Sequence, residues 1–375
     1  MRRSNSMPAM QNRAELNDPG PGIPAWCTRL SLVFSLLIAG YSARCSVADI
    51  GCPAGDGSCD QTTLPLLFAP TTVVALAGGN GLIWVSRDGG ANFSEIIPGD
   101  PATIYRSINI VDSDSIFAGG DNGGPYYIDS IGLDSGWLTP FTPPSLGTFT
   151  STAVSDSGEY GAFSPDGVST PTFYYKASSL ESYSSATISA TGQNLIFFYA
   201  GAFHATVPAA VFVYRRQADG SFQSIGSTAP APDIRGVAVN GATALLVDFA
   251  NNRVLLSTDS GSNWTPHAIT GGTSCSDAAF TMGIYAILCI GSDTIHISTD
   301  GQNWSTASLA PSNFLSSVQS LTAANGFFYI SGQDSGGAAS VMRTADFISF
   351  ENVFTRAGST VYDRAELTTL QSLLP

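Results

Sequence analysis

The sequence predicts an all-β chain that folds as a single seven-bladed β-propeller of four-stranded blades. Three observations predict this fold: the composition, a hairpin-turn motif that recurs, and aromatic residues that return at a period of about 40–45 residues. The chain of 375 residues contains 39 Gly and 21 Pro, and only 12% of its residues are charged. Such a composition favours short strands separated by turns over long charged helices.

The first element along the chain is a predicted leader. Residues 30–41 form an uninterrupted apolar run after Arg29. This run is short for a membrane-spanning helix and typical of a signal peptide, and Ser46-Val47-Ala48 offers a cleavage site. Cys45 leaves a lipid anchor as an alternative, although Arg44 stands where a lipobox has a small residue. We therefore expect a secreted protein or one held at the cell envelope.

Four cysteines follow the leader and predict two disulfides, because an even number in an exported chain is typical of a disulfide framework. Cys52 and Cys59 lie seven residues apart in a Gly-rich segment. Cys275 and Cys289 lie at equal distances from Met282, where a turn between two strands is expected. Cross-strand partners approach within disulfide reach, with a free buried pair as the alternative.

No metal site or cofactor is predicted. Neither cysteine pair has the C-x₂₋₄-C spacing of a zinc site, and the chain has only three histidines. The predicted order of segments is a leader at 1–48, a Cys/Gly-rich segment at 49–69, the propeller at 70–370 and a tail at 371–375.

The recurring hairpin-turn motif is the strongest signal. Residues 86–93 (SRDGGANF) and 257–264 (STDSGSNW) fit the pattern S-x-D-x-G-x-x-W/F, and residues 298–304 (STDGQNW) are one residue shorter. Alternating apolar runs flank each copy, which marks a β-hairpin. The Asp and Ser side chains can hydrogen-bond to backbone groups of the turn, and Gly permits a left-handed backbone. The residues expected to have these structural roles are Ser86, Asp88, Gly90, Phe93, Ser257, Asp259, Gly261, Trp264, Ser298, Asp300 and Trp304.

Aromatic residues at the motif's last position extend the repeat to seven copies. Their spacings are 44, 46, 39, 42, 40 and 46 residues, and each interval has room for four short strands. The seven residues are Phe93, Trp137, Tyr183, Phe222, Trp264, Trp304 and Phe350.

The C-terminal segment is predicted to close the ring. Residues 363–370 (DRAELTTL) are similar to RSINIV from Arg106 and RGVAV from Arg235, which are both expected as innermost strands. The first repeat lacks such a strand. The tail is therefore expected to complete the first blade and to remove an exposed sheet edge.

The turn motif resembles the Asp-box of sialidases, trans-sialidases, sortilin-type receptors, xyloglucan-active glycosidases and photosystem II assembly factors. This resemblance spans nearly the whole predicted propeller and implies the fold rather than an activity. In these families the Asp-box lies away from the binding face, so Asp88, Asp259 and Asp300 are not expected to be catalytic. A sialidase-like R-I-P motif before the first Asp-box is missing, because no arginine lies between Asp49 and Ser86. We assign no catalytic residue.

Three arginines are candidate residues for binding an anionic ligand. Arg106, Arg235 and Arg364 each lie near the start of an expected innermost strand, so they could form an anion-binding cluster at the channel. Alternatively, each arginine pairs locally with a carboxylate such as Asp233 or Asp363.

Charge and motifs together predict a binding scaffold. From residue 46 onward the chain has 10 basic and 27 acidic residues, which disfavours nucleic acid as a partner. We expect an exported, monomeric, non-enzymatic propeller that binds a protein or a glycan on its loop-rich face. Trp137 and the pair Tyr126-Tyr127 are candidate contacts, with packing between blades as the alternative. The alternative is a carbohydrate-active enzyme, a sialidase-like glycoside hydrolase with a diverged site.

Overall fold

The regular structure of the described residues consists of strands. The computed structural model describes residues 70–96, 102–111, 115–121, 126–128, 138–140, 149, 151–155, 157–164, 172–177, 184–187, 195–207, 211–227, 230–289, 294–309, 317–358 and 360–370. The expected leader, Cys45, the expected Cys52–Cys59 disulfide, Trp137 and Tyr183 lie outside these residues. The segment Pro70–Gln371 forms one compact unit.

Each four-stranded sheet is called a blade, and its strands are given from the innermost outward. Blade 1 consists of β28 (Val361–Leu370), β1 (Pro70–Gly78), β2 (Ile83–Ser86) and β3 (Ser94–Ile96), and blade 2 of β4 (Tyr105–Ile110), β5 (Ile116–Gly120), β6 (Tyr126–Ile128) and β7 (Leu138–Pro140). Blade 3 consists of β8 (Ser151–Val154), β9 (Tyr160–Ser164), β10 (Thr172–Lys176) and β11 (Ser184–Thr187), and blade 4 of β12 (Ile196–Tyr199), β13 (Ala202–Thr206), β14 (Val211–Arg216) and β15 (Phe222–Ser227). Blade 5 consists of β16 (Ile234–Asn240), β17 (Thr243–Asp248), β18 (Arg253–Ser257) and β19 (Thr265–Ala268). Blade 6 consists of β20 (Cys275–Thr281), β21 (Ile284–Cys289), β22 (Thr294–Ser298) and β23 (Ser305–Ser308), and blade 7 of β24 (Ser317–Ala324), β25 (Phe327–Gln333), β26 (Ala339–Thr344) and β27 (Glu351–Arg356).

The blade count expected from the aromatic repeat needs a correction. Six blades, not seven, are each complete within one continuous stretch of the described chain. The remaining four-stranded sheet is a composite of β28 with β1, β2 and β3, strands from opposite ends of the described unit. The physical reason is ring closure, because a sheet built from both ends leaves no unpaired edge between the first and last repeats.

Strand β28 occupies the innermost position that the sequence assigned to residues 363–370. It runs antiparallel to β1 and pairs with it along its whole length, from Pro70 opposite Leu370 to Gly78 opposite Val361. The sequence comparison predicted that this strand begins at residue 363. In the structure it begins two residues earlier, at Val361.

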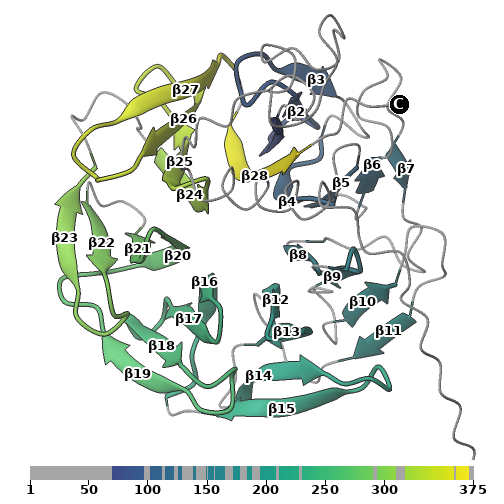
Figure 1. The fold of residues 1–375 in the computed structure, drawn as a ribbon, viewed down its shortest axis with the longest axis vertical. Coiled ribbons are helices and arrows are strands. Elements are labelled where there is room, and N and C mark those ends of the chain that lie inside the picture. Colours follow the sequence, from purple (N-terminus) through teal and green to yellow (C-terminus); the bar gives the residue numbers. More distant parts are fainter. Residues whose placement is uncertain are drawn as a thin grey trace, which may run out of the picture. The chain divides into compact units, whose positions relative to one another are not determined.

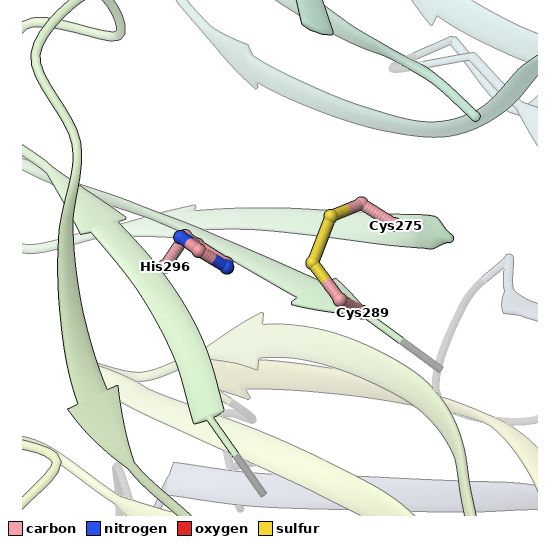
Figure 2. Close-up of side chains that lie close together, drawn as sticks. All are labelled: Cys275, Cys289 and His296. Carbon is pink, nitrogen blue, oxygen red and sulfur yellow. A yellow bond between two sulfur atoms is a disulfide. The ribbon is translucent and has the colours of Figure 1, made fainter. Parts of the chain in front are cut away.

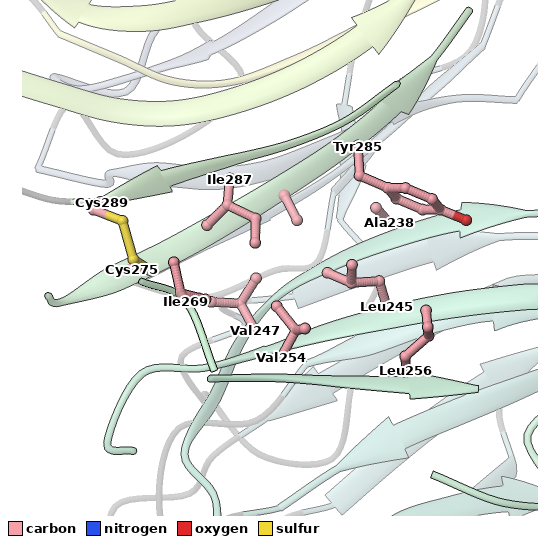
Figure 3. Packing of buried hydrophobic residues seen from close by; sticks show 11 residues of the cluster. Ala238, Leu245, Val247, Val254, Leu256, Ile269, Cys275, Tyr285, Ile287 and Cys289 are labelled. Carbon is pink, nitrogen blue, oxygen red and sulfur yellow. A yellow bond between two sulfur atoms is a disulfide. The ribbon is translucent and has the colours of Figure 1, made fainter. Parts of the chain in front are cut away.

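Neighbouring blades lie side by side (Figure 1), and the hydrophobic core lies between them. Leu245 and Val247 of blade 5, for example, pack in one cluster with Tyr285 and Ile287 of blade 6 (Figure 3). Second strands are buried almost throughout, as in β5, whereas outer strands such as β19 are mostly exposed. A second strand has a blade on each side, so it reads as a continuous apolar run rather than as an alternating one.

Polar side chains also join neighbouring innermost strands. In three cases a backbone N–H of one blade donates to a side-chain oxygen of the preceding blade, which satisfies a donor near the channel. These bonds run from Thr152 to Ser107 Oγ (3.2 Å), from Ile196 to Ser151 Oγ (2.9 Å) and from Leu321 to Asp277 Oδ2 (2.7 Å).

Two innermost strands approach closely at Gly236, and this predicts the effect of a substitution. A Cβ on Gly236 would lie 2.6 Å from the backbone Cα of Asp277 in the next blade. Gly236→Ala is therefore expected to destabilise the fold by about 1–3 kcal/mol, because the two backbones must move apart. Urea unfolding would measure this free energy. Gly79→Ala is the control, since its Cβ would meet nothing closer than 3.6 Å, and equal effects of the two substitutions would contradict the expectation.

Candidate functional site

Five innermost strands carry a β-bulge at the same position. In blades 1, 2, 5, 6 and 7, one residue near the start of the innermost strand has no partner opposite it on the second strand. Bulges re-aim a side chain and are over-represented next to functional sites. The bulge residues are Tyr362, Arg106, Arg235, Ser276 and Gln319.

The bulge residues lie on the face where each innermost strand begins, and we call this the entry face. Hydrogen bonds there join the segment before an innermost strand to the end of its second strand, as from Asp121 N to Ile104 O (3.0 Å) and from Phe249 N to Asp233 O (2.8 Å). The S-x-D turns lie at the opposite end of the strands. Ser260 N, in one of these turns, donates to Ala242 O in the turn that follows β16.

Arg106 is held by a carboxylate and an aromatic ring. Its Nε and Nη2 donate to the two carboxylate oxygens of Asp121 at 2.7 and 2.8 Å. Its guanidinium carbon lies 5.5 Å from the ring centroid of Tyr362, the bulge residue of blade 1. The hydrogen bond to Asp121 raises the pKa of Arg106. The side chain remains 42% exposed, so this fixed guanidinium is available at the surface.

Arg235 repeats this arrangement in blade 5. Its Nε and Nη2 donate to Asp233 Oδ2 at 3.0 and 2.9 Å, and its guanidinium carbon lies 3.5 Å from the centroid of the Phe249 ring. The local pairing with Asp233 is the alternative that the sequence left open for this arginine. A planar guanidinium that stacks on a ring and binds one carboxylate has little freedom left to lose on binding.

The third predicted arginine does not occupy the equivalent position. Arg364 pairs with Leu76, and the side chain of Arg364 lies outside the described part of the structure. The bulge position of blade 1 belongs to Tyr362, two residues earlier. The sequence similarity aligned Arg364 with Arg106 and Arg235. The register shift at Ala77/Gly78 shows instead that Tyr362 is the residue equivalent to these two arginines. Sequence reasoning therefore missed Tyr362, Ser276 and Gln319.

The three S-x-D turns close from within by the same hydrogen bonds. In the first turn Ser86 Oγ donates to Asp88 Oδ1 (2.6 Å) and accepts from Gly90 N (2.8 Å). Asp88 also accepts from the backbone and side-chain nitrogens of Asn92 at 2.9 and 2.7 Å. The other turns repeat these bonds through Ser257, Asp259, Gly261 and Asn263, and through Ser298, Asp300, Gly301 and Asn303. The carboxylates serve the turns, which is the structural role expected for them.

A fourth turn of this kind follows β26. Phe347 N donates to Thr344 Oγ1 (2.8 Å), and the backbone nitrogens of Ile348 and Ser349 donate to Asp346 Oδ1 (both 2.8 Å). This turn precedes Phe350, the last aromatic residue of the predicted repeat, and departs from the full pattern because Thr replaces Ser and Phe347 takes the left-handed position with φ 56°. This conformation is uncommon for a residue other than Gly.

The aromatic residue after each described turn packs against the preceding blade. The ring of Phe93 in blade 1 contacts Phe354 of blade 7, with centroids 5.0 Å apart. In the same way Phe222 of blade 4 contacts Phe173 of blade 3, at 4.7 Å. Trp264, Trp304 and Phe350 belong to the clusters that join their blades to blades 4, 5 and 6. The period of the aromatic residues is therefore the period of the interfaces between blades.

The turns predict a loss of stability in acid. Hydrogen bonds, led by that from Ser86, hold the pKa of Asp88 at about 2, and similar bonds lower the pKa of Asp259, Asp300 and Asp346. An unfolded Asp binds its proton near pH 4, so protonation favours the unfolded chain. The ionised turn carboxylates therefore stabilise the folded chain fully above about pH 4, and this stabilisation is expected to disappear as the pH falls towards 2. Urea midpoints between pH 6 and 2.5 would measure it, and Asp88→Asn should reduce this dependence; an unchanged profile would contradict the assignment.

Cys275 and Cys289 form the predicted disulfide, and a histidine lies beside it (Figure 2). The turn is a two-residue one with positive φ at Met282 and Gly283, which alone would place Cys275 opposite residue 290. The bulge at Ser276 shifts the register by one and restores the pair.

His296 of β22 completes a buried cluster with the two cysteines. One ligand atom from each of the three residues lies within 4.8 Å of the others. Burial lowers the pKa of His296, so its imidazole is neutral near pH 7. The spacing rule for metal ligands missed this group because the register of three strands, rather than chain spacing, brings the residues together.

Comparisons with known proteins identify the fold. No protein-family model and no curated protein sequence matches the chain. A catalytically inactive virginiamycin B lyase from Staphylococcus aureus, solved with quinupristin, is similar over 78% of this chain and 99% of its own, with a TM-score of 0.54 and 9% identity. The chain is a β-propeller. Apo AztD from Citrobacter koseri (TM-score 0.52, 14% identity, 81% and 99% covered) and YCF48 bound to D1 peptide (TM-score 0.51, 13% identity, 72% and 93% covered) share the fold.

At sequence identities this low, the similarities show the fold alone. Membership of the Asp-box superfamily therefore stays a prediction. Among the residues that the structure describes, no helix is long and apolar enough to cross a membrane.

Proposed function

We propose that this propeller is an exported protein-binding scaffold that takes a segment of a partner protein on its entry face. The observation that carries the proposal is the repeated bulge on five innermost strands. A bulge costs ladder hydrogen bonds, and its repetition at one position places different side chains in equivalent places around the channel. Such a surface can vary its chemistry without changing the fold.

The side chains at the bulges suit protein recognition. Arg and Tyr are enriched among the residues that dominate binding energy in protein interfaces. Arg106 and Arg235 are each fixed by a carboxylate and a ring, so little side-chain entropy remains to be lost when a partner binds. A guanidinium has five N–H donors, so a carboxylate on one edge leaves donor capacity for a partner's carbonyl or carboxylate oxygens.

Similar propellers support a protein partner over a glycan. YCF48 has been solved with a D1 peptide, which shows that a propeller of this general shape can hold a peptide. A sialidase-like use of the arginines has no such support, because Arg364 does not occupy the position equivalent to that of Arg106 and Arg235. The second candidate, a glycoside hydrolase, therefore lacks an observation in its favour.

Export rests on the leader-like run at residues 30–41 and on the Cys275–Cys289 disulfide. Disulfides persist in oxidising compartments such as the periplasm or the extracellular space. Whether Cys45 carries a lipid would decide between anchoring and free secretion, and mass spectrometry of the mature N-terminus would distinguish the two.

Affinity capture with matched variants tests the binding face. The full chain would be compared with an Arg106→Ala/Arg235→Ala double variant and with Arg343→Ala. Arg343 is the matched control because it also pairs with a carboxylate, Glu351, and lies 4.8 Å from the ring centroid of Phe327, but on the third strand of blade 7. We expect a captured partner to bind the double variant at least about 10-fold more weakly, and the control unchanged. Equal capture by all three proteins would contradict this face.

A further inference from the structure

His296 is buried without a polar partner. The residue is 1% exposed, and neither ring nitrogen has a hydrogen-bond partner among the described residues. Buried imidazoles are usually hydrogen-bonded, and imidazole is also the commonest metal ligand in proteins. An unpaired ring in such a place therefore needs an explanation.

The nearest chemistry is the Cys275–Cys289 pair. Cys275 lies opposite Cys289 on neighbouring strands, and His296 lies opposite Ile287, two residues from Cys289 and on the same face of the sheet. Figure 2 shows the imidazole beside the two sulfur atoms, and the ligand atoms lie within 4.8 Å of one another. Both cysteines are fully buried.

A glycine covers the cluster and shows where the imidazole points. A Cβ on Gly272 would lie 3.0 Å from Cys275 Sγ and 3.2 Å from His296 Nε2. Nε2 and the sulfur therefore both face the segment that joins blades 5 and 6, where a Cβ would also crowd Ile269 Cγ2 at 2.6 Å.

We propose that the reduced form of this cluster is a zinc site, with Cys275, Cys289 and His296 as ligands. Reduction adds two electrons and two protons to the S–S bond and yields two thiols; a dithiol reductant supplies both and becomes a disulfide, whereas a phosphine supplies the electrons, takes oxygen from water and becomes a phosphine oxide. Binding of Zn²⁺ then releases two protons as both sulfurs become thiolates. The disulfide and the metal site exclude each other, because the two thiolates that bind zinc exist only after the S–S bond has been reduced.

The donor set matches zinc in charge and geometry. Two thiolates offset the charge of Zn²⁺, so the buried complex is neutral, whereas a bare cation there would be strongly disfavoured. Zinc bonds of about 2.3 Å to sulfur and about 2.0 Å to nitrogen place neighbouring ligand atoms about 3.5–4 Å apart. The three ligand atoms already lie within 4.8 Å of one another, so they need to move only slightly to reach these distances once the S–S bond opens. Two cysteines and one histidine are a known three-residue ligand set for zinc, with a fourth position for another ligand.

Cobalt and zinc titrations of the full chain test the site. The N-terminal cysteines would be replaced by Ser at positions 27, 45, 52 and 59, so that only Cys275 and Cys289 can supply thiolates. The chain would be reduced with a phosphine and desalted without oxygen. Co²⁺ would be added first, because thiolate-to-cobalt charge transfer reports sulfur ligands directly. Zn²⁺ would then compete against a chromogenic chelator.

Two variants separate a ligand role from a packing role. His296→Phe removes the proposed ligand and keeps an aromatic ring in place. His204→Phe is the matched control, because His204 is also fully buried with Nε2 unpartnered, but its ring stacks on Phe197 with centroids 5.4 Å apart in blade 4. Circular dichroism melts would establish that both variants are folded.

We expect one Zn²⁺ per reduced chain, none per oxidised chain, and sulfur charge-transfer bands with Co²⁺. His296→Phe should weaken zinc binding by at least about 10-fold, whereas His204→Phe should leave it unchanged. Failure of the reduced chain to bind zinc, equal binding by the oxidised chain, or full affinity in His296→Phe would each overturn the proposal. If His296→Phe does not fold, loss of the cobalt bands in folded Cys275→Ser is the required result. The test is independent of the proposed protein partner.

Discussion

Removal of residues 361–375 is expected to abolish cooperative folding of the propeller. These residues include all of β28, which forms nine residue pairs with β1 and is the innermost strand of blade 1. At about 1 kcal/mol net per hydrogen bond, the lost ladder is worth on the order of 5–10 kcal/mol. That range is comparable with the whole stability of a typical domain, about 5–15 kcal/mol. The truncation also exposes the edge of β1, which invites pairing between chains.

Size-exclusion chromatography and thermal unfolding would measure the effect of this truncation. The control ends the chain after Gln371, which removes only residues beyond the strand. The shorter truncation should unfold like the full chain, and the longer one should aggregate or lack a cooperative transition. A monomeric, cooperatively unfolding protein without β28 would contradict the closure of blade 1 by this strand.

Asp248→Ala is expected to lower the free energy of unfolding by about 3–5 kcal/mol, a large effect for a single substitution. The Asp248 carboxylate is fully buried at the end of β17. It accepts hydrogen bonds from Asp233 N (3.0 Å), Asn251 Nδ2 (2.8 Å) and Arg253 Nε (2.7 Å). Its removal leaves the guanidinium of Arg253, only 13% exposed, without its carboxylate. A buried charge that has lost its partner is strongly destabilising.

Urea unfolding of matched variants separates this effect from the loss of any ion pair. Glu351→Ala breaks the Arg343–Glu351 pair, whose carboxylate side chain is 62% exposed, and should cost at most about 1 kcal/mol. Asp248→Asn keeps the shape of the side chain and some acceptor capacity. Its loss in the free energy of unfolding should therefore lie between those of Asp248→Ala and Glu351→Ala. An Asp248→Ala variant as stable as Glu351→Ala would contradict the buried network.

The propeller fold could be predicted from the sequence because the aromatic residues recur with the same period as the interfaces between blades. Phe93, Trp264 and Trp304 recur where one blade packs on the preceding one, so spacing alone revealed the blades. The closing strand was also visible, because residues 363–370 are similar to other innermost strands. The blade count is where spacing failed, because the aromatic period indicated seven blades and six are complete within one stretch of the described chain.

The candidate site could be predicted only in part because bulges are invisible in sequence. A bulge moves one residue out of the ladder, so Arg106 and Arg235 fall at equivalent places while Arg364 does not, despite its similar neighbours. The same shift keeps Cys275 opposite Cys289, although the turn between their strands is not centred on Met282. The pairing was predicted correctly, but the register that produces it needed the structure.

Site-specific photo-cross-linking tests the central claim most directly. A photoreactive amino acid would replace Tyr362 on the entry face and, in a second protein, Ile348, which is 84% exposed in a turn on the opposite face. Irradiation in the cells that make the protein, followed by mass spectrometry, would identify what touches each face. We expect a specific protein adduct from position 362 and none from position 348. The same adduct from position 348 alone would contradict a partner on the entry face.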